Sequence, residues 1–216
     1  MFYMVRLYAG YVYICKKCVT MRSTMQEVMR YMKIMFASLG CDKNLVDSEV
    51  MLGLLDEKGY QIIDDETQAD VMVINTCCFI HDAKEESIQT ILDMASYKED
   101  GRLKALVVTG CLAQRYKQEI IDEIEEVDAV IGTTAHDEIF DVIEKTLEGQ
   151  KELDIQDVDS LVEIDAKRVV TTGGHYAHLK IAEGCDKHCT YCIIPKIRGN
   201  YRSVPMERLL KEAQDL

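Results

Sequence analysis

A regular alternation of short apolar runs with amphipathic stretches constrains the fold of this chain more than any other feature. The spacing predicts helices over 44–60, 82–99, 113–126 and 136–149, separated by strands over 33–41, 60–65, 70–79, 103–111 and 129–133. The strand at 70–79, DVMVINTCCF, is mostly apolar without a break, as is typical of strands buried on both faces of a parallel sheet. We therefore expect an α/β fold, a parallel sheet with helices on both faces, whose ligand site lies at the carboxyl ends of its strands.

This pattern divides the chain into four parts. Residues 32–149 form the predicted sheet domain, and the acidic stretch 150–174, which ends in Gly173-Gly174, is expected to be a linker. A further strand at 175–185 and a helix at 203–216, capped by Ser203, are expected to begin a second domain. Residues 1–31 fit neither pattern, and we expect them to be an extra segment outside the fold.

Composition narrows the classes of function. The 216 residues carry a formal net charge of −13, so general binding to nucleic acid is not expected, although 180–211 holds seven Lys or Arg against three Asp or Glu. The chain contains no stretch of 18 apolar residues, so its sequence predicts no membrane span. Nine cysteines are too few for a disulfide scaffold but enough for metal sites in a reduced compartment. We expect a cytoplasmic protein.

Three of these cysteines follow three different predicted strands. Cys41, Cys77 and Cys111 end the stretches SLGC, NTC and TGC. Because the carboxyl ends of parallel strands share one edge of a sheet, we expect these thiols to converge and to bind one metal centre. The alternative is three separate buried cysteines that act as small apolar side chains. Cys78 should point to the opposite side of its strand from Cys77, so we leave it out of the triad.

A second triad lies close together in EGCDKHCTYCIIP. Cys185, Cys189 and Cys192 have the spacing Cys-x3-Cys-x2-Cys, and no fourth cysteine is near. A 4Fe–4S cluster normally takes four thiolates, so three would leave one iron open to a ligand such as S-adenosylmethionine. Tyr191 is a possible stacking partner for the adenine of that ligand. Zinc stays an alternative, because His175, His178 and His188 lie nearby.

The two triads lie within segments that resemble one enzyme family. SLGCDKNLVDSE, INTC, VTGCLAQR, LKIAEGCDKHCTYCIIPKIRG and YRS are similar to the methylthiotransferases, which are radical S-adenosylmethionine enzymes. The amino-terminal motif resembles the branch that modifies a ribosomal protein. The resemblance spans about 32–216 and implies a flavodoxin-like or Rossmann-like amino-terminal domain, followed by the first βα unit of a truncated radical S-adenosylmethionine barrel.

The resemblance also implies a reaction. Cys41, Cys77 and Cys111 would hold an auxiliary 4Fe–4S cluster, and Cys185, Cys189 and Cys192 a cluster that cleaves S-adenosylmethionine to a radical. The substrate would be the β-carbon of an aspartate on small-subunit ribosomal protein twelve, with an external electron donor. The resemblance assigns no catalytic side chain. Without most of the barrel, we expect the chain itself to be inactive. A tRNA-modifying enzyme of the sister branch and a non-catalytic, metal-binding module remain alternatives.

Overall fold

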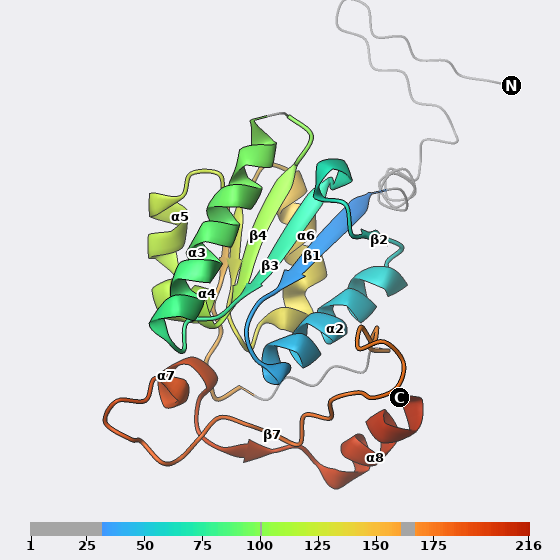
Figure 1. The fold of residues 1–216 in the computed structure, drawn as a ribbon, viewed down its shortest axis with the longest axis vertical. Helices are drawn as coiled ribbons and strands as arrows, with labels where there is room; N and C mark the ends of the chain where they lie inside the picture. The colour runs from blue at the N-terminus through green and yellow to red at the C-terminus, as the bar shows by residue number, and fades with distance from the viewer. Residues whose placement is uncertain (1–31, 100, 161–166) are drawn as a thin grey trace, which may run out of the picture.

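The computed structural model describes residues 32–99, 101–160 and 167–216. They form a parallel sheet of six strands with helices on both faces, as predicted (Figure 1). The strand order is β2-β1-β3-β4-β5-β6, so the order reverses between β1 and β3. The expected extra segment at 1–31, with its Cys15–Cys18 pair, lies outside the described residues.

The elements of the sheet domain follow the predicted alternation closely. The strands are β1 (Lys33–Ser38), β2 (Gln61–Ile63), β3 (Val71–Thr76), β4 (Ala105–Gly110), β5 (Ala129–Ile131) and β6 (Glu152–Asp154). The helices are α2 (Asp42–Glu57), α3 (His81–Ala95), α4 (Cys111–Tyr116), α5 (Gln118–Glu123) and α6 (Ile139–Leu147). Three short 3-10 helices are η1 (Glu66–Gln68), η2 (Ser96–Lys98) and η3 (His136–Glu138).

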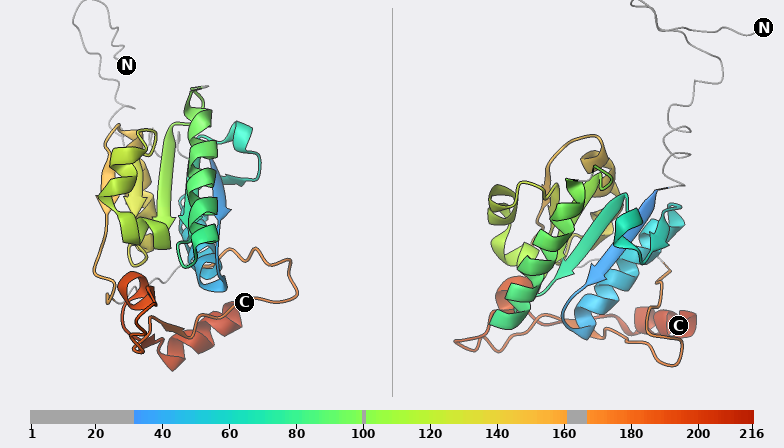
Figure 2. Two further views of the ribbon diagram at one scale, coloured as in Figure 1. Left: turned by 60° about the vertical axis from the view of Figure 1, so that its left-hand side comes forward. Right: turned by 45° about the horizontal axis from the view of Figure 1, so that its top comes forward.

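Alternating side chains of the central strands build two separate cores. Met72, Ile74 and Leu106 face α3, α4 and α5, whereas Val73 and Val107 face α2 and α6. Every residue of β3 and β4 is buried, which explains their nearly continuous apolar sequences. Figure 2 shows the two helical layers on either side of the sheet.

Two parts of the predicted pattern were wrong. The expected linker contributes β6, which pairs with β5 at the edge of the sheet. This strand is only three residues long and acidic at both ends, so no apolar run announces it. The single helix expected at 113–126 is two helices, because Lys117 between them has the left-handed φ of 46°.

Residues 167–171, here called the strap, cross α2 in close contact. Gly53 lies under the strap, and a Cβ built on it would meet the carbonyl oxygen of Lys167 at 1.9 Å. Glu49 accepts hydrogen bonds from the backbone and hydroxyl of Thr171, at 2.7 and 2.8 Å. Arg168 Nε lies 3.1 Å from Glu49 as an ion pair without hydrogen-bond geometry. Arg168 also pairs with Glu212 at 2.5 Å, so the strap links α2 to the end of the chain.

Gly53→Ala should displace the strap. Glycine to alanine inside a helix ordinarily stabilises a protein by about 1 kcal/mol, but here the new methyl group would overlap a backbone oxygen. We expect a lower thermal midpoint and faster hydrogen exchange at Val169 and Thr171, whose amides donate to Glu49. Asp56→Ala, at an exposed position of the same helix, is the control. A rise in midpoint with unchanged exchange would show that the strap is not held against Gly53.

The carboxyl-terminal segment runs beneath the carboxyl ends of the strands (Figure 1). It contains β7 (Ala182–Glu183), α7 (Ile194–Arg198), β8 (Arg202–Ser203) and α8 (Met206–Asp215). The strand expected at 175–185 is reduced to β7, which pairs antiparallel with β8. Ser203 lies in β8, and Pro205 instead occupies the N-cap of α8, so the predicted cap was wrong.

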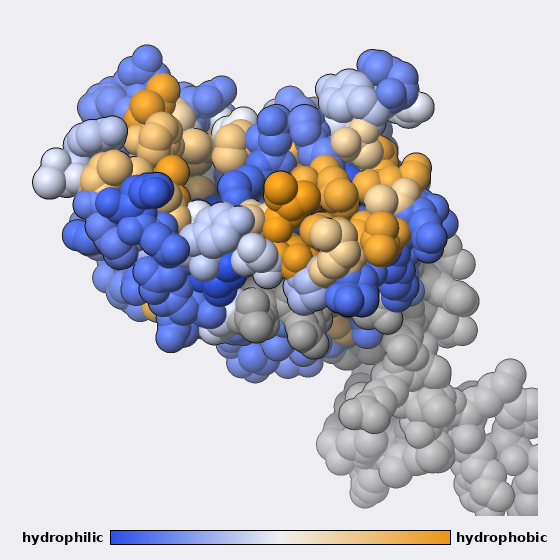
Figure 3. All heavy atoms as spheres, turned by 90° about the horizontal axis from the view of Figure 1, so that it is seen from below, coloured by the Kyte–Doolittle hydropathy of each residue, from blue (hydrophilic) through white to orange (hydrophobic). Residues whose placement is uncertain are grey.

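Helix α8 has no buried residue. Leu210 is 58% exposed and Met206 64%, and Ile181 before β7 is 62% exposed. Seen from below, apolar residues gather in two groups, a larger one on the side of α8 and a smaller one on the side of α7 (Figure 3). Among the described residues, no helix is both long and apolar enough to cross a membrane.

Candidate functional site

The first cysteine triad lies where the sequence predicted it. Cys41 is the N-cap of α2 after β1, Cys77 directly follows β3, and Cys111 begins α4 after β4. These three strands are neighbours in the sheet, so the cysteines share its carboxyl edge. Gly40, at φ 107°, lets the backbone beside Cys41 approach the Cys77 side chain, since a Cβ there would lie 3.2 Å from the Cys77 sulfur.

Asn44 connects the three strand ends. Its side-chain amide donates to the carbonyl oxygens of Leu39 and Thr76, both at 2.9 Å. Its side-chain oxygen accepts a contact from the Cys111 thiol, with Sγ and Oδ1 3.7 Å apart. Asn44 is fully buried, so these bonds are shielded from water. One side chain thus joins the loop before Cys41, the residue before Cys77, and Cys111 itself.

Cys78, which the sequence analysis left out of the triad, lies in the same core cluster as Cys111. It packs in the core under α3 and α4, and its thiol donates to the carbonyl oxygen of Cys111 at 3.2 Å. Burial raises its pKa, which keeps the thiol protonated. Cys41 is exposed whereas Cys77 and Cys111 are buried, so the triad opens toward solvent on the Cys41 side.

The second triad is presented on a tight loop between β7 and α7. The Cys185 amide donates to the carbonyl of Gly199, and the Cys192 amide to that of Cys189, both at 3.0 Å. Gly184 permits the first closure, because a Cβ there would lie 2.0 Å from the carbonyl oxygen of Asn200. All three cysteines are partly or fully exposed. Tyr191 beside them is 89% exposed and therefore available to a ligand.

A buried charge network joins the two halves of the site. Arg198, at the end of α7, donates to Asp47 at 2.6 Å and to Glu183 at 3.3 Å. Lys180 bonds the other oxygen of Asp47 and also pairs with Glu183 at 3.2 Å. Burial by itself would raise the pKa of Asp47, but Lys180 and Arg198 more than offset it and hold that pKa well below its usual range.

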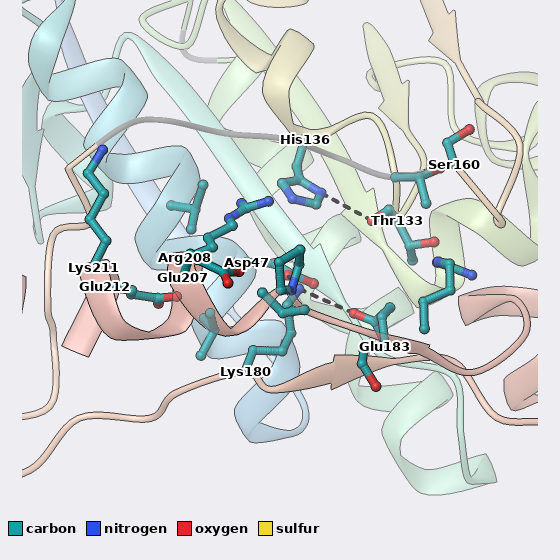
Figure 4. A pocket seen from close by; sticks show the side chains of 17 residues that line it. Asp47, Thr133, His136, Ser160, Lys180, Glu183, Glu207, Arg208, Lys211 and Glu212 are labelled. Atoms are coloured by element: carbon teal, nitrogen blue, oxygen red, sulfur yellow. Dashed lines mark hydrogen bonds and ion pairs between the residues drawn. The ribbon is translucent and has the colours of Figure 1, made fainter.

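Asp47, Lys180 and Glu183 of this network also line a pocket of about 660 Å³ between α2 and the carboxyl-terminal segment. Figure 4 shows Asp47 and His136 on the side of the sheet domain, and Glu207, Arg208 and Lys211 on α8. The His136 ring is buried and contacts the carbonyl of Thr133 at 3.1 Å, and burial lowers its pKa. Neither cysteine triad lines this pocket.

The triads differ from a compact site for one ion. In the described part of the chain, three potential metal ligands have atoms within 4.8 Å of one another. They are His81, Asp82 and Glu85, and all three are exposed. Neither group of three thiols is that close. A 4Fe–4S cluster attaches each thiolate to a separate iron and so accepts a wider triad than a single zinc ion does. The histidines considered as zinc ligands, at 175, 178 and 188, do not join a triad within that distance.

Comparison with known proteins agrees with these motifs. The model of a family described as "Uncharacterized protein family UPF0004" matches residues 33–132. The ribosomal protein uS12 methylthiotransferase RimO of Lachnoclostridium phytofermentans is 67% identical over 185 residues, which is 86% of this chain. Over this stretch the chain is similar to RimO. RimO proteins of Clostridioides difficile and Thermoanaerobacter sp. are 48% and 51% identical over 86% and 83% of the chain. The chain spans 42%, 42% and 41% of the length of these three relatives.

Sequence reasoning identified the cysteines but missed the polar residues between them. Asn44 and Asp47 lie in the quoted stretch SLGCDKNLVDSE at helical spacing, three residues apart, so they share one face of α2. Two polar residues at this spacing on one face of a helix were the available signal. Arg198 follows the second triad in the sequence, and the structure shows it buried.

Proposed function

We propose that this chain is the cluster-binding part of a methylthiotransferase that acts on ribosomal protein uS12. One observation carries the proposal: two groups of three cysteines flank the same carboxyl edge of the sheet, one on the strand ends and one on the loop beneath them. The relatives support the choice of substrate, because those compared above are named as uS12 methylthiotransferases. The β-carbon of an aspartate on uS12 is the position proposed for the methylthio group.

The residues fit the proposed cofactors. Cys41, Cys77 and Cys111 would hold an auxiliary 4Fe–4S cluster in a mostly buried setting, where Asn44 keeps the three strand ends together. Cys185, Cys189 and Cys192 would hold a second cluster on an open loop, with a vacant iron for S-adenosylmethionine. When bound, these groups supply the radical chemistry and the sulfur. The protein positions the thiols, provides Tyr191 for stacking and offsets cluster charge with Arg198.

Other parts of the proposal follow from the same assignment. An external electron donor would have to reach the exposed second triad, and a reduced, cytoplasmic setting would keep both triads as thiols. General binding to nucleic acid is not part of the proposal, because the chain has a net charge of −13. The sister activity on tRNA and a zinc-binding module are the alternatives.

A hybrid enzyme tests the substrate. Residues 32–216 would replace the matching part of the 67%-identical RimO, which supplies the rest of the length. We expect the hybrid, loaded with iron and sulfide, to add a methylthio group to uS12 and none to tRNA, as measured by mass spectrometry. Cys77→Ala in the hybrid, which removes a ligand of the auxiliary cluster, should abolish the addition. Methylthiolation of tRNA instead would assign the chain to the sister branch.

A further inference from the structure

The strongest observation outside the cysteines is that Arg198 crosses from one triad to the other. It ends the short helix α7, six residues after Cys192, yet its side chain is 5% exposed and reaches into the sheet domain. Its Nη2 donates to Asn44 Oδ1, the same oxygen that faces the Cys111 sulfur. Its Nη1 bonds Asp47, one turn along α2 from Asn44.

The contacts of Arg198 form a chain that reaches Cys111 and the backbone just before Cys41 and Cys77. Arg198 orients Asn44 by bonding its oxygen, so that the amide nitrogen must face Leu39 and Thr76. Those carbonyls belong to the segments that carry Cys41 and Cys77. The guanidinium and the Cys111 sulfur share Asn44 Oδ1 as a partner, so the positive charge lies one side chain away from that thiol. Polar groups that orient metal ligands commonly change metal affinity by about 10–100-fold when removed.

We propose that Arg198 is a positioning residue for the amino-terminal triad, supplied by the segment that carries the second triad, so that the auxiliary cluster is held fully only when this segment is docked. The inference rests on the proposed function, because it assumes a cluster on Cys41, Cys77 and Cys111. The fixed positive charge beside Cys111 would also favour the reduced, more negative form of that cluster.

Lys180 provides a matched control for Arg198. Like Arg198, it bonds Asp47 and Glu183 and comes from the carboxyl-terminal segment. Its hydrogen bonds and ion pairs in the described structure do not include Asn44 or Cys111. Replacing either cation therefore weakens the same ion network, but only the change at Arg198 removes the bond to Asn44, which contacts Cys111.

The test uses the full chain with Cys185, Cys189 and Cys192 all changed to Ala, so that only the first triad can bind a cluster. After reconstitution, the rate of iron loss to a chelator and the reduction potential are measured. Arg198→Met should speed iron loss about tenfold and shift the potential to more negative values, whereas Lys180→Met should leave both near the parent. Arg198→Lys, which keeps the charge but not the two-armed contact, should lie between them.

Each result decides one question. If the parent triple variant binds no iron, the proposed function fails at the first triad, and this inference fails with it. If the parent holds its cluster but Arg198→Met behaves like the parent, or Lys180→Met is as damaging as Arg198→Met, the positioning role is wrong while the cluster assignment stands. Circular dichroism shows whether each variant is folded. If Arg198→Met is not folded, Arg198→Lys decides, and parental iron retention in that variant would overturn the inference.

Discussion

Anaerobic reconstitution should load about eight irons per chain, and Cys185→Ala with Cys189→Ala should remove about half of them. The physical reason is separation: the first triad is fixed to the ends of β1, β3 and β4, while the second lies on a loop whose backbone closes on Gly199 and Cys189. Changing two cysteines on the loop therefore leaves the three cysteines at the sheet edge, and the core side chains around them, in place.

The reciprocal variant and a matched cysteine complete this experiment. Cys77→Ala with Cys111→Ala should remove the other half of the iron and spare the loop. Cys78→Ala changes a neighbouring thiol that donates to the backbone carbonyl of Cys111, so it should keep both clusters. Complete loss of iron in either double variant would show that the triads form one interdependent centre.

Asp47→Asn should cost about 3–5 kcal/mol in the free energy of unfolding at pH 7. Asp47 is 4% exposed and is the shared partner of Lys180 and Arg198, so its removal leaves two buried cations with only Glu183 between them. Urea unfolding measures the loss. Asp42→Asn on the same helix is the control, because that side chain is 78% exposed and should change stability by less than about 1 kcal/mol.

The contribution of Asp47 also has a defined pH dependence. Its pKa is lowered in the folded protein, so its stabilising effect is fully present above the unfolded pKa of about 4. The effect is lost as pH falls from there toward the folded pKa. The difference in unfolding free energy between the parent and Asp47→Asn should therefore be constant near neutral pH and shrink in acid. A difference that does not change with pH would show that Asp47 is not held charged by the network.

The regular part of the fold could be predicted because periodicity and burial agree there. The strands β3 and β4 are buried along their whole length, so their sequences are mostly apolar. The cysteine triad followed from topology, since three strand ends in one parallel sheet must lie at one edge. The edge strand β6 was missed because it has one partner strand and needs no apolar run.

The polar centre of the site could not be predicted by the same reasoning. Asn44, Asp47 and Arg198 each bond a partner more than 25 residues away, and a single sequence does not tell which distant residue such a side chain will meet. The strap is similar: its contact with Gly53 spans more than 100 residues and depends on a missing side chain. The predicted linker therefore turned out to contain a strand and a buried arginine.

Mössbauer spectroscopy of the chain reconstituted with ⁵⁷Fe, together with sulfide and zinc analysis, tests the central claim most directly. The account predicts spectra of 4Fe–4S clusters only, with about eight irons, an equal amount of sulfide and no stoichiometric zinc. Adding S-adenosylmethionine should change the signal of one iron in the loop cluster. The same change should occur in the Cys77→Ala, Cys111→Ala variant, which keeps that cluster. Zinc in either triad, or iron without sulfide, would contradict it.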